Sequence, residues 1–201
     1  MTEEKVVVVA STNQGKIDEF RQMVDPEGYT VKSLKDLPHP IEIDETGKTF
    51  EENAVLKAMS VTKVFGIPAI ADDSGLEIDA FGKAPGVYSA RYLGHDTPYE
   101  TKNRIILERM QGVTERTCRY VCAIAWTRPG EEPAVFADTV ECVIAQEPAG
   151  HNGFGYDPIV YYEPLKKTMA ELLPEEKNAI SHRGKALRKL EAWLHETGRD
   201  M

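Results

Sequence analysis

Two adjacent aspartates near the middle of the chain could hold a divalent cation. They stand in the run Ala71-Asp72-Asp73-Ser74-Gly75, directly after an apolar segment. Mg²⁺ takes one or two protein carboxylates and fills its other positions with water and phosphate, so one aspartate could bind the ion while the other orients a water molecule. Aspartate, serine and glycine also favour turns. Taken alone, the run suits a polar turn in which Asp72 caps a backbone amide.

A second run, Ser11-Thr12-Asn13-Gln14-Gly15-Lys16, joins an apolar segment to a helical pattern. A helix N-terminus presents unpaired N–H groups and a partial positive charge. Hydroxyls, an amide, a glycine and a lysine at that place suit a bound polyphosphate. The GxxxxGK[ST] spacing of a P-loop is absent. An ordinary capped turn between a strand and a helix is the alternative, and this run alone does not decide between the two.

An acidic stretch before and within the next helical pattern could supply a further metal carboxylate. Its members are Glu42, Asp44, Glu45, Glu51 and Glu52. For most of them a solvated acidic surface is the better interpretation. Glu52 already has a local role, because it stands three residues after Thr49 with the spacing of a capping box.

Two segments near the C-terminal end could contact a nucleotide. In Gly153-Phe154-Gly155-Tyr156-Asp157-Pro158, glycines flank aromatic rings, and an aromatic face can stack on a purine. A turn carrying two core aromatic residues is the alternative, but the unusual composition favours binding. Lys177 and the run Ser181-His182-Arg183-Gly184-Lys185 place cations at the start of a helix, where they oppose the helix dipole. An anionic or acceptor-rich ligand would explain them, and surface charge is the alternative.

The elements that must position these segments predict a mixed α/β fold. Hydrophobic periodicity and turn signals predict strands at 5–10, 30–34, 69–71, 76–79, 119–127, 134–145 and 158–162. They predict helices at 16–23, 49–65, 99–110 and 181–197. Residues 72–75 are expected to form a tight turn between two strand pieces. The element order predicts an elongated, curved, mixed sheet with helices packed on it.

Composition narrows the class of protein. The chain has 201 residues, a length that suits a single domain over 1–201. It contains no apolar run long enough to span a membrane. Its net charge of −9 argues against sequence-independent binding to nucleic acid. No secretory signal is evident, and the odd set Cys118, Cys122 and Cys142 lacks a metal or redox spacing. We therefore expect a cytoplasmic protein with buried free thiols.

Taken together, the segments resemble the inosine triphosphate pyrophosphatase family, whose members act on non-canonical purine nucleoside triphosphates. The runs that carry the resemblance cover nearly the whole chain: STNQGK at 11–16, TFEENAVLKA at 49–58, PAIADDSGLEIDA at 68–80, APGVYSARY at 84–92, EPAGHNGFGYDPI at 147–159 and EEKNAISHRGKAL at 175–187. The divergent places are His151-Asn152 and the turn at 128–133.

The resemblance implies roles for individual residues. Ser11, Thr12, Asn13, Gln14, Gly15 and Lys16 match the triphosphate-binding loop. Asp73 matches the essential acid, both a Mg²⁺ ligand and the proton acceptor for the attacking water, and Glu45 matches the other metal carboxylate. Asp72 and Lys57 match supporting positions, and the sequence leaves open which aspartate is the general base. The implied nucleotide contacts are Ser74, Phe154, Gly155, Tyr156, Asp157, Lys177, His182 and Arg183.

The resemblance also implies an activity and an assembly. We expect an elongated two-lobed α/β fold with a central active-site cleft, forming a homodimer in which the loop 84–92 takes part. The expected activity is Mg²⁺-dependent hydrolysis of ITP, dITP or XTP to the monophosphate and pyrophosphate. Base choice would follow from donors, backbone N–H groups or Arg183, that face a 6-oxo group. Two alternatives remain: a pyrophosphatase for modified pyrimidine nucleotides, and a nucleotide-binding module without catalysis.

Overall fold

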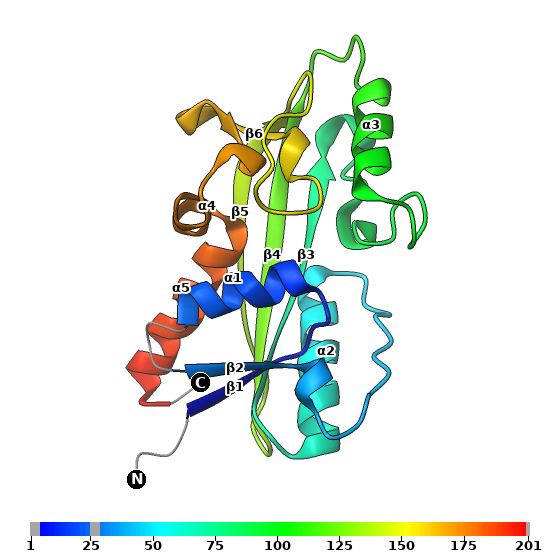
Figure 1. The fold of residues 1–201 in the computed structure, drawn as a ribbon. Helices are drawn as coiled ribbons and strands as arrows, with labels where there is room; N and C mark the ends of the chain where they lie inside the picture. The colour runs from blue at the N-terminus through cyan, green and yellow to red at the C-terminus, as the bar shows by residue number, and fades with distance from the viewer. Residues whose placement is uncertain (1–4, 25–28, 200–201) are drawn as a thin grey trace. The chain divides into compact units, whose positions relative to one another are not determined.

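A mixed sheet and five α-helices make up the fold of residues 5–24 and 29–199, which the computed structural model describes (Figure 1). The strands are β1 (Lys5–Val9), β2 (Tyr29–Ser33), β3 (Ala69–Ile78), β4 (Thr117–Thr127), β5 (Ala134–Ile144), β6 (Val160–Tyr162) and β7 (Lys167–Thr168). The helices are α1 (Gln14–Val24), α2 (Phe50–Phe65), α3 (Tyr99–Arg109), α4 (Pro174–Ile180) and α5 (His182–Thr197). This confirms the predicted α/β class.

The strand order of the sheet is β2-β1-β3-β4-β5-β6-β7. β1 pairs in parallel with β2, from Lys5 opposite Tyr29 to Val9 opposite Ser33, and in parallel with β3. β6 is antiparallel to both β5 and β7. β4 and β5 are neighbours joined by residues 128–133, a connection too short for a parallel crossover, so they form the predicted hairpin.

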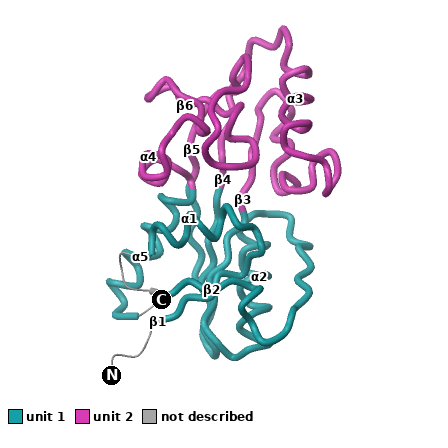
Figure 2. Tube along the Cα trace, viewed as in Figure 1, with its two compact units in different colours: residues 1–73, 122–138, 183–201 teal, residues 74–121, 139–182 magenta. Residues whose placement is uncertain are grey.

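The chain divides into two compact units, drawn in different colours in Figure 2. Unit 1 comprises 1–73, 122–138 and 183–201, and unit 2 comprises 74–121 and 139–182. Each has its own apolar core. The core of unit 1 contains Val7, Val9, Ile17, Phe20, Val24, Val31, Ile70, Cys122, Ile124, Trp126, Ala186, Leu187, Leu190 and Leu194. The core of unit 2 contains Leu76, Ile78, Ile106, Met110, Cys118, Tyr120, Val140, Cys142, Ile144, Tyr156, Ile159, Val160, Met169 and Leu172.

Helix α2 forms where local signals predicted it. Thr49 is its N-cap and accepts a hydrogen bond from the Glu52 amide at 3.1 Å. The Glu52 carboxylate in turn accepts from the Lys48 amide at 2.6 Å, so the capping interaction extends one residue further back than the capping box requires. Gly66 ends the helix with a φ of 65°, a left-handed conformation that suits glycine.

The prediction of a tight turn at 72–75 is wrong. β3 continues without interruption from Ala69 to Ile78, through both aspartates, and most of its residues are buried. The turn-forming residue types at 72–75 do not produce a turn here, because the strand interior supplies ladder hydrogen bonds and neighbouring side chains supply partners for the carboxylates. Consecutive side chains of a strand point to opposite faces, which separates Asp72 from Asp73.

The short elements of unit 2 also differ from the predictions. The strand predicted at 158–162 is a 3₁₀ turn at Asp157–Ile159 followed by β6. The short helix α4 and the two-residue strand β7 were not predicted. Ser181 ends α4, and α5 begins at the next residue. Short elements give too few periods for a pattern to emerge.

Candidate active site

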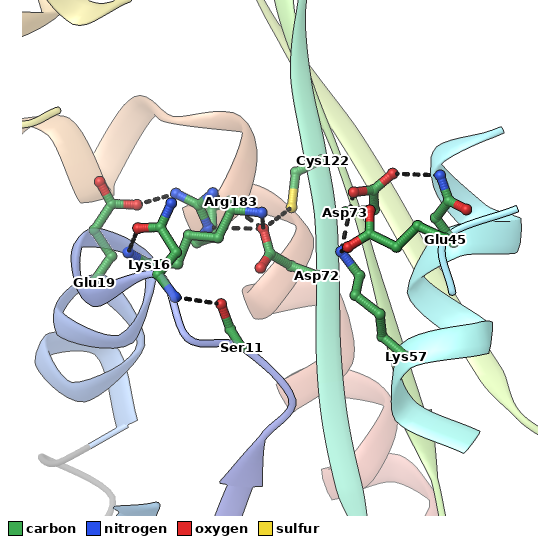
Figure 3. A network of polar contacts seen from close by, with 11 residues as sticks. Ser11, Lys16, Glu19, Glu45, Lys57, Asp72, Asp73, Cys122 and Arg183 are labelled. Atoms are coloured by element: carbon green, nitrogen blue, oxygen red, sulfur yellow. Dashed lines mark hydrogen bonds and ion pairs between the residues drawn. The ribbon is translucent and has the colours of Figure 1, made fainter. Parts of the chain in front are cut away.

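The two aspartates of β3 lie on opposite sides of the strand and belong to two different polar networks of unit 1 (Figure 3). Asp72 points toward α1 and α5. Asp73 points toward α2 and the segment that precedes it. Strand alternation alone accounts for this division, because adjacent residues of an extended strand cannot share a face.

Asp72 is held by two cations. Its Oδ2 accepts from Arg183 Nη2 at 3.0 Å and from Nε at 3.2 Å, and it lies 3.3 Å from Lys16 Nζ. Burial would raise the pKa of Asp72, but Lys16 and Arg183 outweigh it and hold the pKa well below its usual range. Asp72 is therefore a fixed anion at neutral pH.

Glu19 completes this network from α1. It is buried and pairs with Arg183 Nη1. Burial would lower the pKa of Arg183, but Glu19 and Asp72 outweigh burial and raise the pKa. The guanidinium therefore stays charged although only 2% of the residue is exposed. The other oxygen of Asp72, Oδ1, is buried and has no hydrogen-bond partner among the described residues. Such an oxygen is an acceptor that a cation or donor could use.

Asp73 stands in a different environment. Its Oδ1 accepts from Lys57 Nζ at 3.0 Å and its Oδ2 from Asn53 Nδ2 at 3.2 Å. Burial, the largest influence, raises the pKa of Asp73 despite the opposing charges of Lys57 and Lys16. Lys57 also lies 3.5 Å from Glu45 Oε1. Burial would lower the pKa of Lys57, but Asp73, Asp72 and Glu45 together raise it.

The donor set around Lys57 fits a hard divalent cation. Lys57 Nζ lies between the carboxylates of Asp73 and Glu45, which therefore already converge on one positive charge. Over the described ranges, no group of three or more His, Cys, Asp or Glu side chains is placed to hold a metal ion. Mg²⁺ needs fewer, since it binds through one or two carboxylates and completes its shell with water and substrate phosphates.

The run 11–16 forms the entry to α1 and is largely open to solvent. Asn13 Oδ1 accepts from the Lys16 amide at 3.2 Å, and Ser11 Oγ accepts from the Asn13 amide at 3.1 Å. Thr12, Asn13 and Gln14 are exposed. The run thus has the geometry of an ordinary capped turn, the alternative to a phosphate-binding loop. It also leaves polar groups accessible beside Lys16.

A separate polar cluster lies in unit 2 around Asp157. Its Oδ2 accepts from Lys177 Nζ at 2.7 Å and from the Phe154 amide at 3.0 Å, and its Oδ1 accepts from Tyr120 Oη at 2.9 Å. Lys177 Nζ lies 4.8 Å from the centre of the Phe154 ring. The side chain of Asp157, the last residue of the run 154–157, therefore holds this run in place.

The remaining predicted residues of unit 2 have other surroundings. His182 stacks on Tyr120, with ring centres 4.8 Å apart and planes 15° apart. Tyr156 donates to the Ser89 carbonyl at 2.6 Å and packs edge-on against Tyr99. Gly155 accepts a hydrogen bond from Asn103 and lines a cavity of about 530 Å³ beside α3. Ser74 lies half-buried on β3.

The predicted residues divide between the two units. Unit 1 holds Ser11 to Lys16, Glu45, Lys57, Asp72, Asp73 and Arg183, and unit 2 holds Ser74, Phe154 to Asp157, Lys177 and His182. The dipole argument for an anionic ligand at the start of α5 needs correction, because the anions beside Arg183 are the protein's own Asp72 and Glu19. The role of Arg183 as a nucleotide contact stays a prediction.

Sequence reasoning did not select Glu19, Asn53 or Tyr120. An acidic residue on an amphipathic helix normally faces water, and a tyrosine in an apolar strand normally fills a core. The sequence carries no local signal for these residues, because the partner of each lies at least 20 positions away.

Known proteins resemble this chain along nearly all of its length. The sequence profile of the Ham1 family matches residues 7–193. A dITP/XTP pyrophosphatase of Exiguobacterium sp. is 50% identical over 186 residues, which cover 92% of this chain and 95% of that protein. A dITP/XTP pyrophosphatase of Bacillus subtilis is 48% identical over 192 residues, covering 94% and 97%.

Solved structures agree with these sequence matches. The Staphylococcus aureus Ham1 protein has a TM-score of 0.86 and 43% identity, and the match covers 96% of this chain and 100% of that one. A HAM1 protein from Coxiella burnetii has a TM-score of 0.85 and 40% identity, covering 96% and 99%. The resemblance inferred from the motifs is confirmed, and the chain belongs to the Ham1 family.

Proposed function

We propose that this protein hydrolyses non-canonical purine nucleoside triphosphates, ITP, dITP and XTP, to the monophosphate and pyrophosphate. The observation that carries the proposal is the pair of adjacent carboxylates on β3, one fixed as an anion by Lys16 and Arg183 and the other raised in pKa beside Lys57. The name dITP/XTP pyrophosphatase, carried by relatives about half identical to this chain, supports the substrate class. The activity would remove damaged purines from the nucleotide pool.

Lys16 and the run 11–16 bind the triphosphate in this proposal. Asp72 holds the Lys16 ammonium in place from 3.3 Å away, and the lysine side chain keeps 15% exposure through which it can meet phosphate oxygens. Backbone N–H groups at the start of α1 add donors and a partial positive charge. Fixed positive groups of this kind stabilise charge that develops on the phosphoryl oxygens.

Asp73 is the proposed proton acceptor. A water molecule attacks the α-phosphorus, the bond from that phosphorus to the bridging oxygen breaks, pyrophosphate leaves, and the water proton passes to Asp73. Lys57 and Asn53 orient the carboxylate through one hydrogen bond to each oxygen. Asp72 is less suited to this role, because two cations stabilise its charged form.

Asp73 and Glu45 would hold the Mg²⁺ ion. When bound, it would neutralise charge on the triphosphate. Lys57 contacts both carboxylates and would adjust its position around the ion. This assignment rests on the convergence of two oxygen donors, which matches the ligand preference of Mg²⁺.

The test is pyrophosphate release from ITP, XTP, GTP and ATP with Mg²⁺, for the wild type, Asp73→Asn and Asp72→Asn. We expect release from ITP and XTP, and a fall in kcat of at least about 100-fold in Asp73→Asn. Equal cleavage of all four substrates would replace the proposal with a general pyrophosphatase. Cleavage of UTP or dTTP but not ITP would support the pyrimidine alternative, and binding without release would leave a nucleotide-binding module.

Thermal unfolding of the same variants separates catalysis from stability. Asp73→Asn should lower the melting temperature less than Asp72→Asn does, because burial disfavours the charge that the variant removes and Lys57 keeps Glu45 as a partner. Asp72→Asn should lower it, because the charged form of Asp72 is the one that its cations stabilise. Loss of activity in Asp73→Asn together with a large loss of stability would contradict the assigned role.

We also propose that the protein works in the cytoplasm as a homodimer, with 1–201 as one functional domain. The family match over 7–193, which includes residues of both units, supports the single domain. None of the described helices has the length and apolarity needed to cross a bilayer. Tyr88 in the loop 84–92 is 59% exposed, and an exposed aromatic side chain there supports a part for this loop in a subunit interface. Light scattering of the wild type and Tyr88→Glu tests the dimer.

A further inference from the structure

Tyr120 on β4 links two of the residues assigned to nucleotide binding. Its hydroxyl donates to Asp157 Oδ1 at 2.9 Å, and its ring stacks on His182 with centres 4.8 Å apart. The residue is 7% exposed, so solvent has little access to either interaction. All three residues belong to unit 2.

Asp157 uses its carboxylate on the protein itself. It accepts three hydrogen bonds, from Tyr120, Lys177 and the Phe154 amide, and only 3% of the residue is exposed. A buried carboxylate so occupied is better suited to orienting its neighbours than to reading a ligand. The Lys177 ammonium that it holds lies over the Phe154 ring, so one side chain sets both the cation and the aromatic face.

The surroundings keep the Tyr120 hydroxyl a donor. Burial and the adjacent Asp157 raise the pKa of Tyr120 well above its usual value. The hydroxyl therefore stays protonated throughout the working range of pH and presents its proton to Asp157. Its bond fixes the Asp157 rotamer from the side opposite to Lys177, since the two donors use different carboxylate oxygens.

We propose that Tyr120 is a positioning residue for the nucleotide site: through Asp157 it orients Lys177 and the run 153–157, and through its ring it orients His182. This inference rests on the proposed function. It assigns to Asp157 an indirect role, in place of the direct nucleotide contact implied by the family resemblance. Tyr120 itself touches no reacting atom in this account.

The test compares Tyr120→Phe with Tyr161→Phe. The first variant keeps the ring and removes the hydroxyl that Asp157 accepts. The second removes a hydroxyl from a partly buried tyrosine of β6, in the same unit but outside the Asp157 cluster. We expect Tyr120→Phe to raise the KM for ITP by roughly tenfold with kcat changed less than about twofold, because the lost hydrogen bond orients binding groups and not the attacking water. Tyr161→Phe should change neither.

Hydrogen–deuterium exchange of the peptide spanning 150–158 provides a readout that needs no activity. Tyr120→Phe should speed exchange of the Phe154 amide, which donates to Asp157, by roughly tenfold relative to wild type and Tyr161→Phe. Faster exchange with a raised KM supports the inference. Unchanged exchange overturns it, and so does faster exchange with an unchanged KM, which would make Tyr120 merely structural.

The two proposals can fail separately. If the wild type does not hydrolyse ITP, the proposed function fails, and binding of ITP measured by calorimetry replaces KM in the comparison. Weaker ITP binding together with faster exchange in Tyr120→Phe would then still support the positioning role. Equal binding by all three proteins would overturn it.

Discussion

Replacing Arg183 by methionine should destabilise unit 1 far more than replacing an exposed arginine. The variant keeps much of the side-chain length but removes the guanidinium that pairs with Asp72 and Glu19. Breaking a buried ion pair by removing one partner costs about 3–5 kcal/mol, because the remaining charge stays buried without compensation. Lys16 still neutralises part of the Asp72 charge from 3.3 Å, but Glu19 also loses the guanidinium, so we expect a loss of at least about 3 kcal/mol.

The assay is thermal and urea unfolding at pH 7, followed by tryptophan fluorescence. Both tryptophans, Trp126 and Trp193, lie in unit 1 and pack against each other, so they report on the unit that contains the network. A loss of this size should lower the melting temperature by roughly 6–12 °C in a chain of this length. Arg104→Met is the matched control. Its partner Glu108 and Arg104 itself are more than half exposed, so about 0.5 kcal/mol or less should be lost.

The pH dependence sharpens this prediction. The folded-state pKa of Asp72 lies below its unfolded value of about 3.8, so its stabilisation is present above that value and is lost as the pH falls through the folded pKa. Without Arg183 the folded pKa rises, and protonation then relieves the buried charge. The difference in stability between wild type and Arg183→Met should therefore be smaller at pH 4.5 than at pH 7. Equal losses for Arg183→Met and Arg104→Met at pH 7 would refute the reasoning.

Two further changes test local details of unit 2. Gly153→Ala should raise the KM for ITP at least several-fold, because Gly153 has a φ of 69° and an added Cβ would collide with the Asp157 carboxylate. The control is Gly82→Ala, which has a φ of 61° and open space around an added Cβ, so it should lose stability without a change in KM. Kinetics and thermal unfolding of the two variants measure this contrast. Hydrogen bonds from Arg119 and Thr117 hold the pKa of Asp79 well below its usual value, so the wild type should lose stability as the pH falls below about 4. Asp79→Asn should show a smaller change of urea midpoint between pH 5 and pH 3, and an equal change would contradict that role.

Local signals were enough to predict the long helices and the apolar strands. The ends of α2 follow from a capping threonine and a left-handed glycine that stand next to the helix they bound. The last helix follows from leucines spaced along one buried face. Such signals act within one or two turns of the chain, so a sequence displays them without any knowledge of the fold.

The failures have a different physical origin. The run 72–75 contains turn-forming residues, yet long-range strand pairing and the cations of α1, α2 and α5 keep it extended. Tyr120 and Asp157 stand 37 residues apart, and Glu19 and Arg183 stand 164 apart. Partners at such separations are set by the packing of elements, which hydrophobic periodicity does not determine.

The extended conformation of 72–75 bears directly on the proposed chemistry. In a turn, the two carboxylates could approach one another and share a proton or an ion, and their roles could not be told apart. On a strand they face opposite sides: Asp72 contacts Lys16 and Arg183, and Asp73 contacts Lys57. Two cations stabilise the charge of Asp72, which leaves it a weak proton acceptor, whereas burial raises the pKa of Asp73. The strand therefore favours Asp73 as the base and Asp72 as the residue that fixes Lys16, a distinction that the sequence alone left open.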